Sequence, residues 1–138
     1  MTALRRPVPG PLTAAVCVAA ALVLAGCAPP SRPAPVASGI RWELDVSPYR
    51  PAALQAATLR LRALDAAGRP IALQGFRATA SMPEMDHRGE TIAFREMDAG
   101  VYEALHTFSM DGRWEIHISG SVKGKRAEAR IPLEVGAR

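Results

Sequence analysis

Short runs of alternating apolar and polar residues, separated by glycine, proline and aspartate, constrain the fold of this chain more than any other feature. The clearest run is residues 114–119 (WEIHIS), in which the tryptophan and both isoleucines share one face. Because successive side chains of a β-strand point to opposite faces, this period of two predicts a strand with one buried and one solvated side. Similar alternation recurs at residues 59–62 and 131–135, and no long helical period competes with it.

Seven such runs are expected to form strands, at residues 40–46, 57–64, 71–80, 91–97, 101–108, 113–120 and 126–135. Turn-forming residues separate several of them: the segment 65–70 contains Gly68, and Asp-Ala-Gly at 98–100 and Asp-Gly at 111–112 each precede a strand. This pattern predicts an all-β domain over residues 40–138. We expect an immunoglobulin-like β-sandwich of about seven strands.

Residues 1–26 have the features of an export signal. Arg5 and Arg6 precede an apolar stretch, residues 12–25, that is too short for a comfortable membrane span. The signal segment ends in Leu-Ala-Gly followed by Cys27, which resembles the lipobox of bacterial lipoproteins. In those proteins the cysteine thiol receives a diacylglyceryl group, the signal peptide is cleaved before it, and the new amino terminus is acylated. The resemblance implies that Cys27 is the lipidated first residue of the mature protein.

A simple secretory signal cleaved elsewhere, or an uncleaved anchor, are the alternatives to lipidation. If Cys27 is lipidated, its acyl chains hold the protein at a membrane, because each buried methylene contributes about 0.8 kcal/mol. Ala28 rather than aspartate follows the cysteine, which is similar to lipoproteins of the outer membrane. Residues 27–39 are rich in proline and are expected to form an extended spacer. We therefore expect a lipid-anchored protein on the periplasmic side of the cell envelope.

The cysteine count and the charge exclude several classes of site. Cys17 lies in the signal and Cys27 is expected to carry lipid, so the domain has no disulfide and no thiolate metal ligand. Without Arg5 and Arg6, 15 of the 17 basic residues remain against 13 acidic ones. The positive charge is dispersed, which favours a solvated surface over a nucleic-acid site.

Candidate metal ligands crowd together in residues 81–89 (SMPEMDHRG). Proline favours the second position of a β-turn, so Met82 and Met85 are expected to be the ends of a turn in which their thioethers converge. If the chain is extended after Met85, His87 points to the same side. Thioether sulfur is soft and prefers Cu(I), so Met82, Met85 and His87 are predicted to bind copper as Cu(I). Met110 and His117 are candidates for a fourth ligand.

The alternative is a loop that only packs over the end of the sandwich, because methionine is a common gap filler and histidine an ordinary loop residue. Met97 and His106 are interpreted as strand-end or surface residues. The chain lacks a Gly-x-Ser-x-Gly elbow, a phosphate-binding glycine loop and a His-Glu-x-x-His motif. We therefore assign no catalytic residues and expect no enzyme.

Residues 82–87 (MPEMDH), 100–102 (GVY) and 112–116 (GRWEI) together resemble the YtkA-like family, which is related to the FixH-type proteins of cytochrome oxidase assembly. The resemblance covers the second half of the domain. It implies an extracytoplasmic β-sandwich linked to copper handling, and only Met82, Met85 and His87 carry over as ligands. Acylation of Cys27 would remove the terminal amine that some periplasmic carriers use for Cu(II).

Two functions remain open from the sequence. One is a lipoprotein that binds or delivers copper, with the membrane and a copper-accepting envelope protein as partners. The other is a metal-free β-sandwich that acts as an interaction module of an envelope or oxidase-assembly complex. Sensitivity of Cu(I) affinity to the two methionines distinguishes them.

Overall fold

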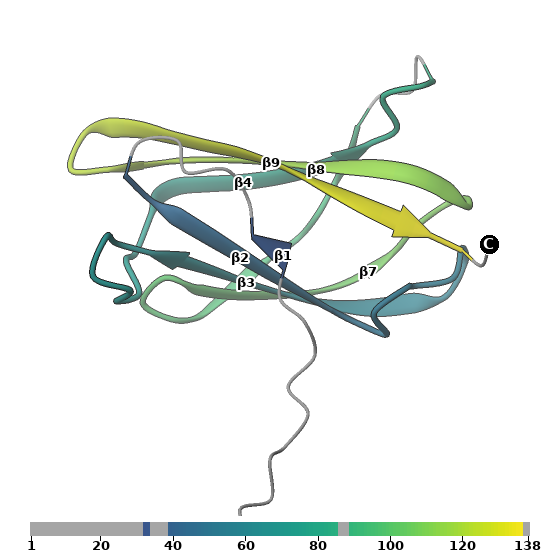
Figure 1. The fold of residues 1–138 in the computed structure, drawn as a ribbon, viewed down its shortest axis with the longest axis horizontal. Helices are drawn as coiled ribbons and strands as arrows, with labels where there is room; N and C mark the ends of the chain where they lie inside the picture. The colour runs from purple at the N-terminus through teal and green to yellow at the C-terminus, as the bar shows by residue number, and fades with distance from the viewer. Residues whose placement is uncertain (1–31, 34–38, 86–88, 137–138) are drawn as a thin grey trace, which may run out of the picture.

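The computed structural model describes residues 32–33, 39–85 and 89–136 of the 138-residue chain. These residues form two antiparallel sheets that pack face to face, as Figure 1 shows. The strand order is β1-β2-β3-β7-β6 in the first sheet and β5-β4-β8-β9 in the second. The described residues contain no helix. The all-β class and the β-sandwich predicted from the sequence are therefore confirmed.

The two sheets are built from strands of very different lengths. The first sheet contains β1 (Arg32–Pro33), β2 (Arg41–Ser47), β3 (Ala56–Leu64), β6 (Arg95–Asp98) and β7 (Val101–Thr107). The second contains β4 (Gln74–Ser81), β5 (Glu90–Thr91), β8 (Gly112–Val122) and β9 (Lys125–Val135). A two-residue turn joins β8 to β9, and its residues Lys123 and Gly124 both have positive φ, 49° and 75°. Such turns match the twist of the strands that they connect.

The space between the sheets is filled by the alternating apolar residues that the sequence predicted. In β8, Trp114, Ile116 and Ile118 are each 0% exposed. The same inward alternation occurs in β9 beside it and in β2 and β3 of the facing sheet, where the buried side chains are Trp42, Leu44, Val46, Leu59, Leu61, Ala63, Ile131, Leu133 and Val135. Fully burying one large apolar side chain contributes about 1.5–3 kcal/mol, so this continuous core is the main source of stability.

The strand predicted at residues 71–80 begins only with β4, because the backbone before it bonds to the other sheet. The amide of Ile71 donates to the carbonyl of Ala63 at 2.8 Å. The amide of Leu73 donates to the hydroxyl of Tyr102 at 2.9 Å. These bonds hold the incoming chain across the core before it joins the second sheet.

The single strand predicted at residues 91–97 is divided between the two sheets. Its first residue belongs to β5, which pairs with β4, whereas residues 95–97 belong to β6, which pairs with β7. The chain bends between them, where the amide of Phe94 donates to the carbonyl of Ile92 at 3.1 Å. This prediction was wrong because residues 91–97 contain no Gly, Pro, Asn or Asp that would mark the crossing in the sequence.

The predicted spacer, residues 27–39, also contains an unexpected strand. Arg32 and Pro33 form β1, which pairs antiparallel with β2 at Leu44 and Glu43. Proline has no amide hydrogen to donate, and its position in a terminal strand of the sheet agrees with that limit. The rest of the spacer before Gly39 lies outside the described residues.

Two opposite ends of the sandwich matter for function. We call the end formed by residues 82–85 and 109–112 the loop end, and the end formed by residues 39–40, 71 and 122–127 the hairpin end. Figure 1 shows the segment that follows β4 at one end of the long axis and the β8–β9 turn at the other.

Candidate metal centre

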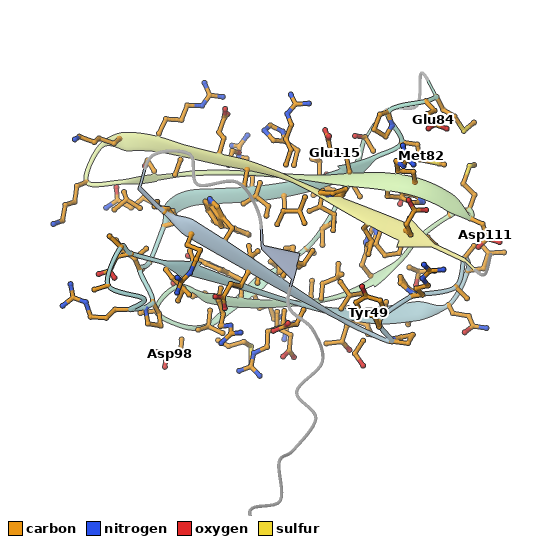
Figure 2. All side chains as sticks on the ribbon, in the orientation of Figure 1. Tyr49, Met82, Glu84, Asp98, Asp111 and Glu115 are labelled. Carbon is orange, nitrogen blue, oxygen red and sulfur yellow. The ribbon has the colours of Figure 1, made fainter. Side chains whose placement is uncertain are left out.

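The loop end begins where β4 stops, with the turn predicted from Pro83. The amide of Met85 donates a hydrogen bond to the carbonyl of Met82, with 3.1 Å between nitrogen and oxygen. This bond closes a four-residue β-turn with proline in the second position, where its fixed φ is suitable. The predicted turn is therefore confirmed, and Figure 2 shows Met82 and Glu84 together at this end of the sandwich.

The two methionines of this turn differ in burial. Met82 is 8% exposed and belongs to the core, whereas Met85 is 48% exposed. Met82 faces inward because it continues the inward alternation of Ala78 and Ala80. Its methyl group lies against the start of β8, where a Cβ added to Gly112 would be 2.6 Å from Met82 Cε. Gly112 also has a φ of +138°, a backbone conformation that favours glycine at this position.

Met110 lies at the same end as Met82, and His87 lies outside the described residues. Met110 is in the loop before β8, two residues from the glycine that Met82 contacts. It is partly buried against the core, and its carbonyl accepts a 3.0 Å hydrogen bond from the indole of Trp114. The structure therefore brings one of the two candidate fourth ligands to the loop end.

His117, the other candidate fourth ligand, lies on the outer face of the second sheet. It pairs with Thr79 of β4, between core residues of β8 that face the other way. Its side chain is 37% exposed, and its Nε2 is 4.0 Å from Oε1 of Glu128. Because Met82 faces the core, the sheet separates the two side chains. The structure does not bring His117 to the core sulfur.

His106, interpreted from the sequence as a strand-end or surface residue, has a more specific environment in β7. Its side chain is 12% exposed, and its Nε2 is 3.4 Å from Oε2 of Glu90, although the two atoms are not aligned as a hydrogen bond. The other carboxylate oxygen of Glu90 accepts a 2.6 Å hydrogen bond from the hydroxyl of Ser109. Burial lowers the pKa of His106, and the nearby carboxylate opposes this effect without overcoming it.

The alternation of apolar residues along β7 is the sequence signal that could have predicted that His106 lies on the core-facing side of this strand. Tyr102, Ala104 and Phe108 are buried at the same period, and the imidazole packs edge-on against Phe108 with ring centroids 4.8 Å apart. A neutral imidazole can bind metals. However, within residues 32–33, 39–85 and 89–136, no group of three or more His, Cys, Asp or Glu side chains could hold a metal ion.

Cys27, the predicted lipidation residue, lies outside the described residues. In the part of the chain that the structure describes, no helix is long and apolar enough to cross a membrane.

Comparison with known proteins gives one family. The model of the YtkA-like family matches residues 37–119, which is more than half of the chain and runs from just before β2 into β8. The match includes Met82, Met85 and Met110. No curated protein matches the chain.

Proposed function

The chain belongs to the YtkA-like family, and from this premise we propose that it is a lipid-anchored envelope protein that binds or delivers copper as Cu(I). The proposed ligands are Met82, Met85 and His87, with Met110 as the candidate fourth ligand. Lipidated Cys27 would hold the domain on the periplasmic side of the envelope, at the outer membrane. Copper is then the cargo of the protein, which is passed to a copper-accepting envelope protein.

The observation that carries this proposal is the closed turn from Met82 to Met85. The 3.1 Å hydrogen bond fixes the turn, and the burial of Met82 fixes its position against β8. A ligand that is ordered before the metal arrives loses little conformational freedom on binding. Neutral thioethers are soft ligands, which favour Cu(I) over zinc, magnesium or calcium. His117 is left out of the proposed ligand set because it lies on the other face of the sheet.

We propose binding rather than catalysis for the loop end. The acidic residue of the turn, Glu84, is 73% exposed, and its carboxylate is 3.8 Å from the guanidinium of Arg113. Exposed pairs of this kind contribute about 0–1 kcal/mol and leave both groups solvated. A solvated carboxylate of this kind is an ordinary surface group.

Titration of the full chain in detergent with Cu(I), in competition with a chromophoric chelator, tests the copper site. We expect one Cu(I) per chain in the wild type. Changing Met82→Leu together with Met85→Leu should weaken the affinity at least tenfold, or about 1.4 kcal/mol, because both sulfurs are lost. The volume of the side chains is conserved, so the cost to folding should be below about 1.5 kcal/mol.

Met97→Leu is the matched control for this titration. Met97 lies in β6, is 61% exposed and is outside the proposed ligand set, so its sulfur should not matter. His87→Asn should weaken binding if the imidazole is a ligand. An unchanged Cu(I) affinity in the double methionine variant would contradict the copper site.

One observation favours a second function, that of a metal-free interaction module. Two large apolar side chains are exposed to solvent on neighbouring strands. Met97 of β6 is 61% exposed, and Leu105 of β7 is 72% exposed. Both line a pocket whose other lining residues are Ala93, Ala104 and the charged Arg95 and Glu103. Exposed apolar patches of this kind often bind other proteins.

Capture of a specific envelope partner by the full chain tests this second function. Leu105→Ser should weaken the capture if the β6–β7 surface is the binding site, whereas the double methionine variant and copper chelators should leave it unchanged. A partner that is lost on chelation supports copper delivery instead.

A further inference from the structure

The hairpin end carries a basic surface that the copper proposal does not use. The turn between β8 and β9 and the residues around it read Lys123-Gly124-Lys125-Arg126, and the two lysines are the only ones in the chain. Both lysines are exposed, and neither forms an ion pair with any residue that the structure describes. Arg126 is 80% exposed and pairs with Glu128. One ammonium group therefore lies in the tight turn and a second on the first residue of β9, and neither is paired with a carboxylate of the described residues.

An apolar pocket of about 200 Å³ lies beside this turn. Its apolar lining comes from Ile40, Ile71, Val122 and Ala127, and both lysines are also among the lining residues. The one acidic lining residue, Asp65, is already bound by the guanidinium of Arg69, with Nη2 2.9 Å from Oδ2. Apolar surface next to free ammonium groups suits the boundary of an anionic bilayer, where phosphates lie outside hydrocarbon.

The proposed lipid anchor is close enough to bring this surface to a membrane. Gly39, where the proline-rich spacer enters the domain, lines the pocket. Earlier in the spacer, β1 pairs Arg32 with Leu44 at the edge of the first sheet. Because an extended chain spans at most about 3.6 Å per residue, the Cα of Cys27 lies within about 18 Å of the Cα of Arg32. Lipidated Cys27 would therefore hold this edge near the bilayer.

We propose that the hairpin end, through Lys123, Lys125, Arg126 and the adjoining pocket, docks onto anionic phospholipid headgroups of the membrane that anchors the protein. The inference rests on the lipid anchor of the proposed function and is independent of copper. Tethering raises the effective concentration of lipid at the turn, so a few cations are sufficient for contact. The loop end lies at the opposite end of the sandwich (Figure 1) and then faces away from the bilayer, where a copper-accepting protein can reach it.

Lysine footprinting tests the docking, because lysine-specific reagents modify no side chain outside this turn. The lipidated chain is reconstituted into vesicles of phosphatidylcholine alone, or of phosphatidylcholine mixed with phosphatidylglycerol, and acetylation of Lys123 and Lys125 is followed by mass spectrometry. We expect acetylation to be about threefold or more slower on the anionic vesicles, and high salt to remove the difference by screening. Equal rates on both kinds of vesicle would overturn the proposal.

Arg126→Gln and Arg95→Gln form a matched pair for this assay. Both keep the two lysines and remove one exposed positive charge, from the turn or from β6. Arg126→Gln should reduce the protection of the lysines, and Arg95→Gln should not. An equal loss of lysine protection in the two variants would show that the net charge of the protein attracts it to the vesicles. That result would overturn docking through the hairpin end.

Flotation separates this proposal from the lipid anchor. A chain that fails to float with neutral vesicles lacks the anchor, and both proposals then fail. A chain that floats with equal acetylation rates keeps the anchor and refutes docking alone. Protection found only in native envelopes and absent from anionic vesicles would assign the surface to a protein partner.

Discussion

Replacing Gly100 with alanine should destabilise the sandwich much more than the same change at Gly75. Gly100 connects β6 to β7 with a φ of +71°, and a Cβ added there would lie 2.4 Å from the backbone nitrogen of Ile71. Gly75 has a similar φ of +62°, but a Cβ added there would meet nothing within 4 Å. The pair therefore separates the cost of the backbone conformation from the cost of the steric clash.

The expected magnitudes follow from these contacts. The left-handed conformation costs alanine about 1–2 kcal/mol at both positions. Reduced freedom of the unfolded chain offsets about 0.4–1 kcal/mol of this at both. Only Gly100→Ala adds overpacking, about 1–3 kcal/mol, because backbone atoms cannot rotate away as a side chain can. The shift would also disturb the 2.8 Å hydrogen bond from the Ile71 amide to the Ala63 carbonyl.

Urea unfolding followed by tryptophan fluorescence measures both variants. The chain has two tryptophans, Trp42 and Trp114, and both are 0% exposed, so their emission reports loss of the core. We expect the unfolding free energy of Gly100→Ala to be lower than that of Gly75→Ala by about 1–3 kcal/mol. A difference below about 0.5 kcal/mol would refute the close approach of Gly100 to the segment before β4.

Two further predictions concern buried polar groups. Burial lowers the pKa of His106, so the unfolded chain binds a proton there that the folded chain does not. The unfolding free energy should therefore fall as the pH decreases from above 6.5, the ordinary histidine pKa, through the lowered pKa of the folded state. His106→Asn should remove this part of the pH dependence, which urea unfolding at several pH values measures. A pH profile that is the same in both proteins would contradict the buried, neutral imidazole. Tyr102→Phe should keep the ring stack on Phe76, whose centroid is 4.1 Å away, but leave the Leu73 amide without its acceptor. The expected cost is about 1–3 kcal/mol in unfolding free energy, and a neutral substitution would mean that this amide finds another partner.

The sequence predicted the sandwich because alternation reports directly on which side chains are buried. The alternation of Trp114, Ile116 and Ile118 was sufficient to predict both the strand and the face of it that is buried. Alternation does not report which strand is the neighbour, and no turn-forming residue marks the point near Phe94 where the chain changes sheets. The edge pairing of Arg32 with Leu44 was missed for a related reason, since a proline-rich segment joins a sheet only when an exposed edge is available.

At the candidate site, local chemistry was predictable and the relation between strands was not. Pro83 was sufficient to predict the turn that the Met85 amide closes. The outer position of His117 also followed from the alternation of β8, which buries Ile116 and Ile118. The inward position of Met82 did not follow, because it depends on the register between β4 and β8 and on a glycine that leaves room for its methyl group.

The burial of Met82 has a consequence for the proposed copper site. Its side chain is already ordered in the core, whereas Met85 is 48% exposed and must be ordered by the metal. Fixing a methionine side chain costs up to about 1.5–2 kcal/mol, so the exposed sulfur should contribute less to affinity, by up to about 10- to 30-fold. Met82→Leu should therefore weaken Cu(I) binding more than Met85→Leu does. Equal losses of Cu(I) affinity in the two variants would mean that Met82 leaves the core to bind copper. Exposing its side chain would cost about 1.5–3 kcal/mol, which would cancel the entropy that its ordered position saves.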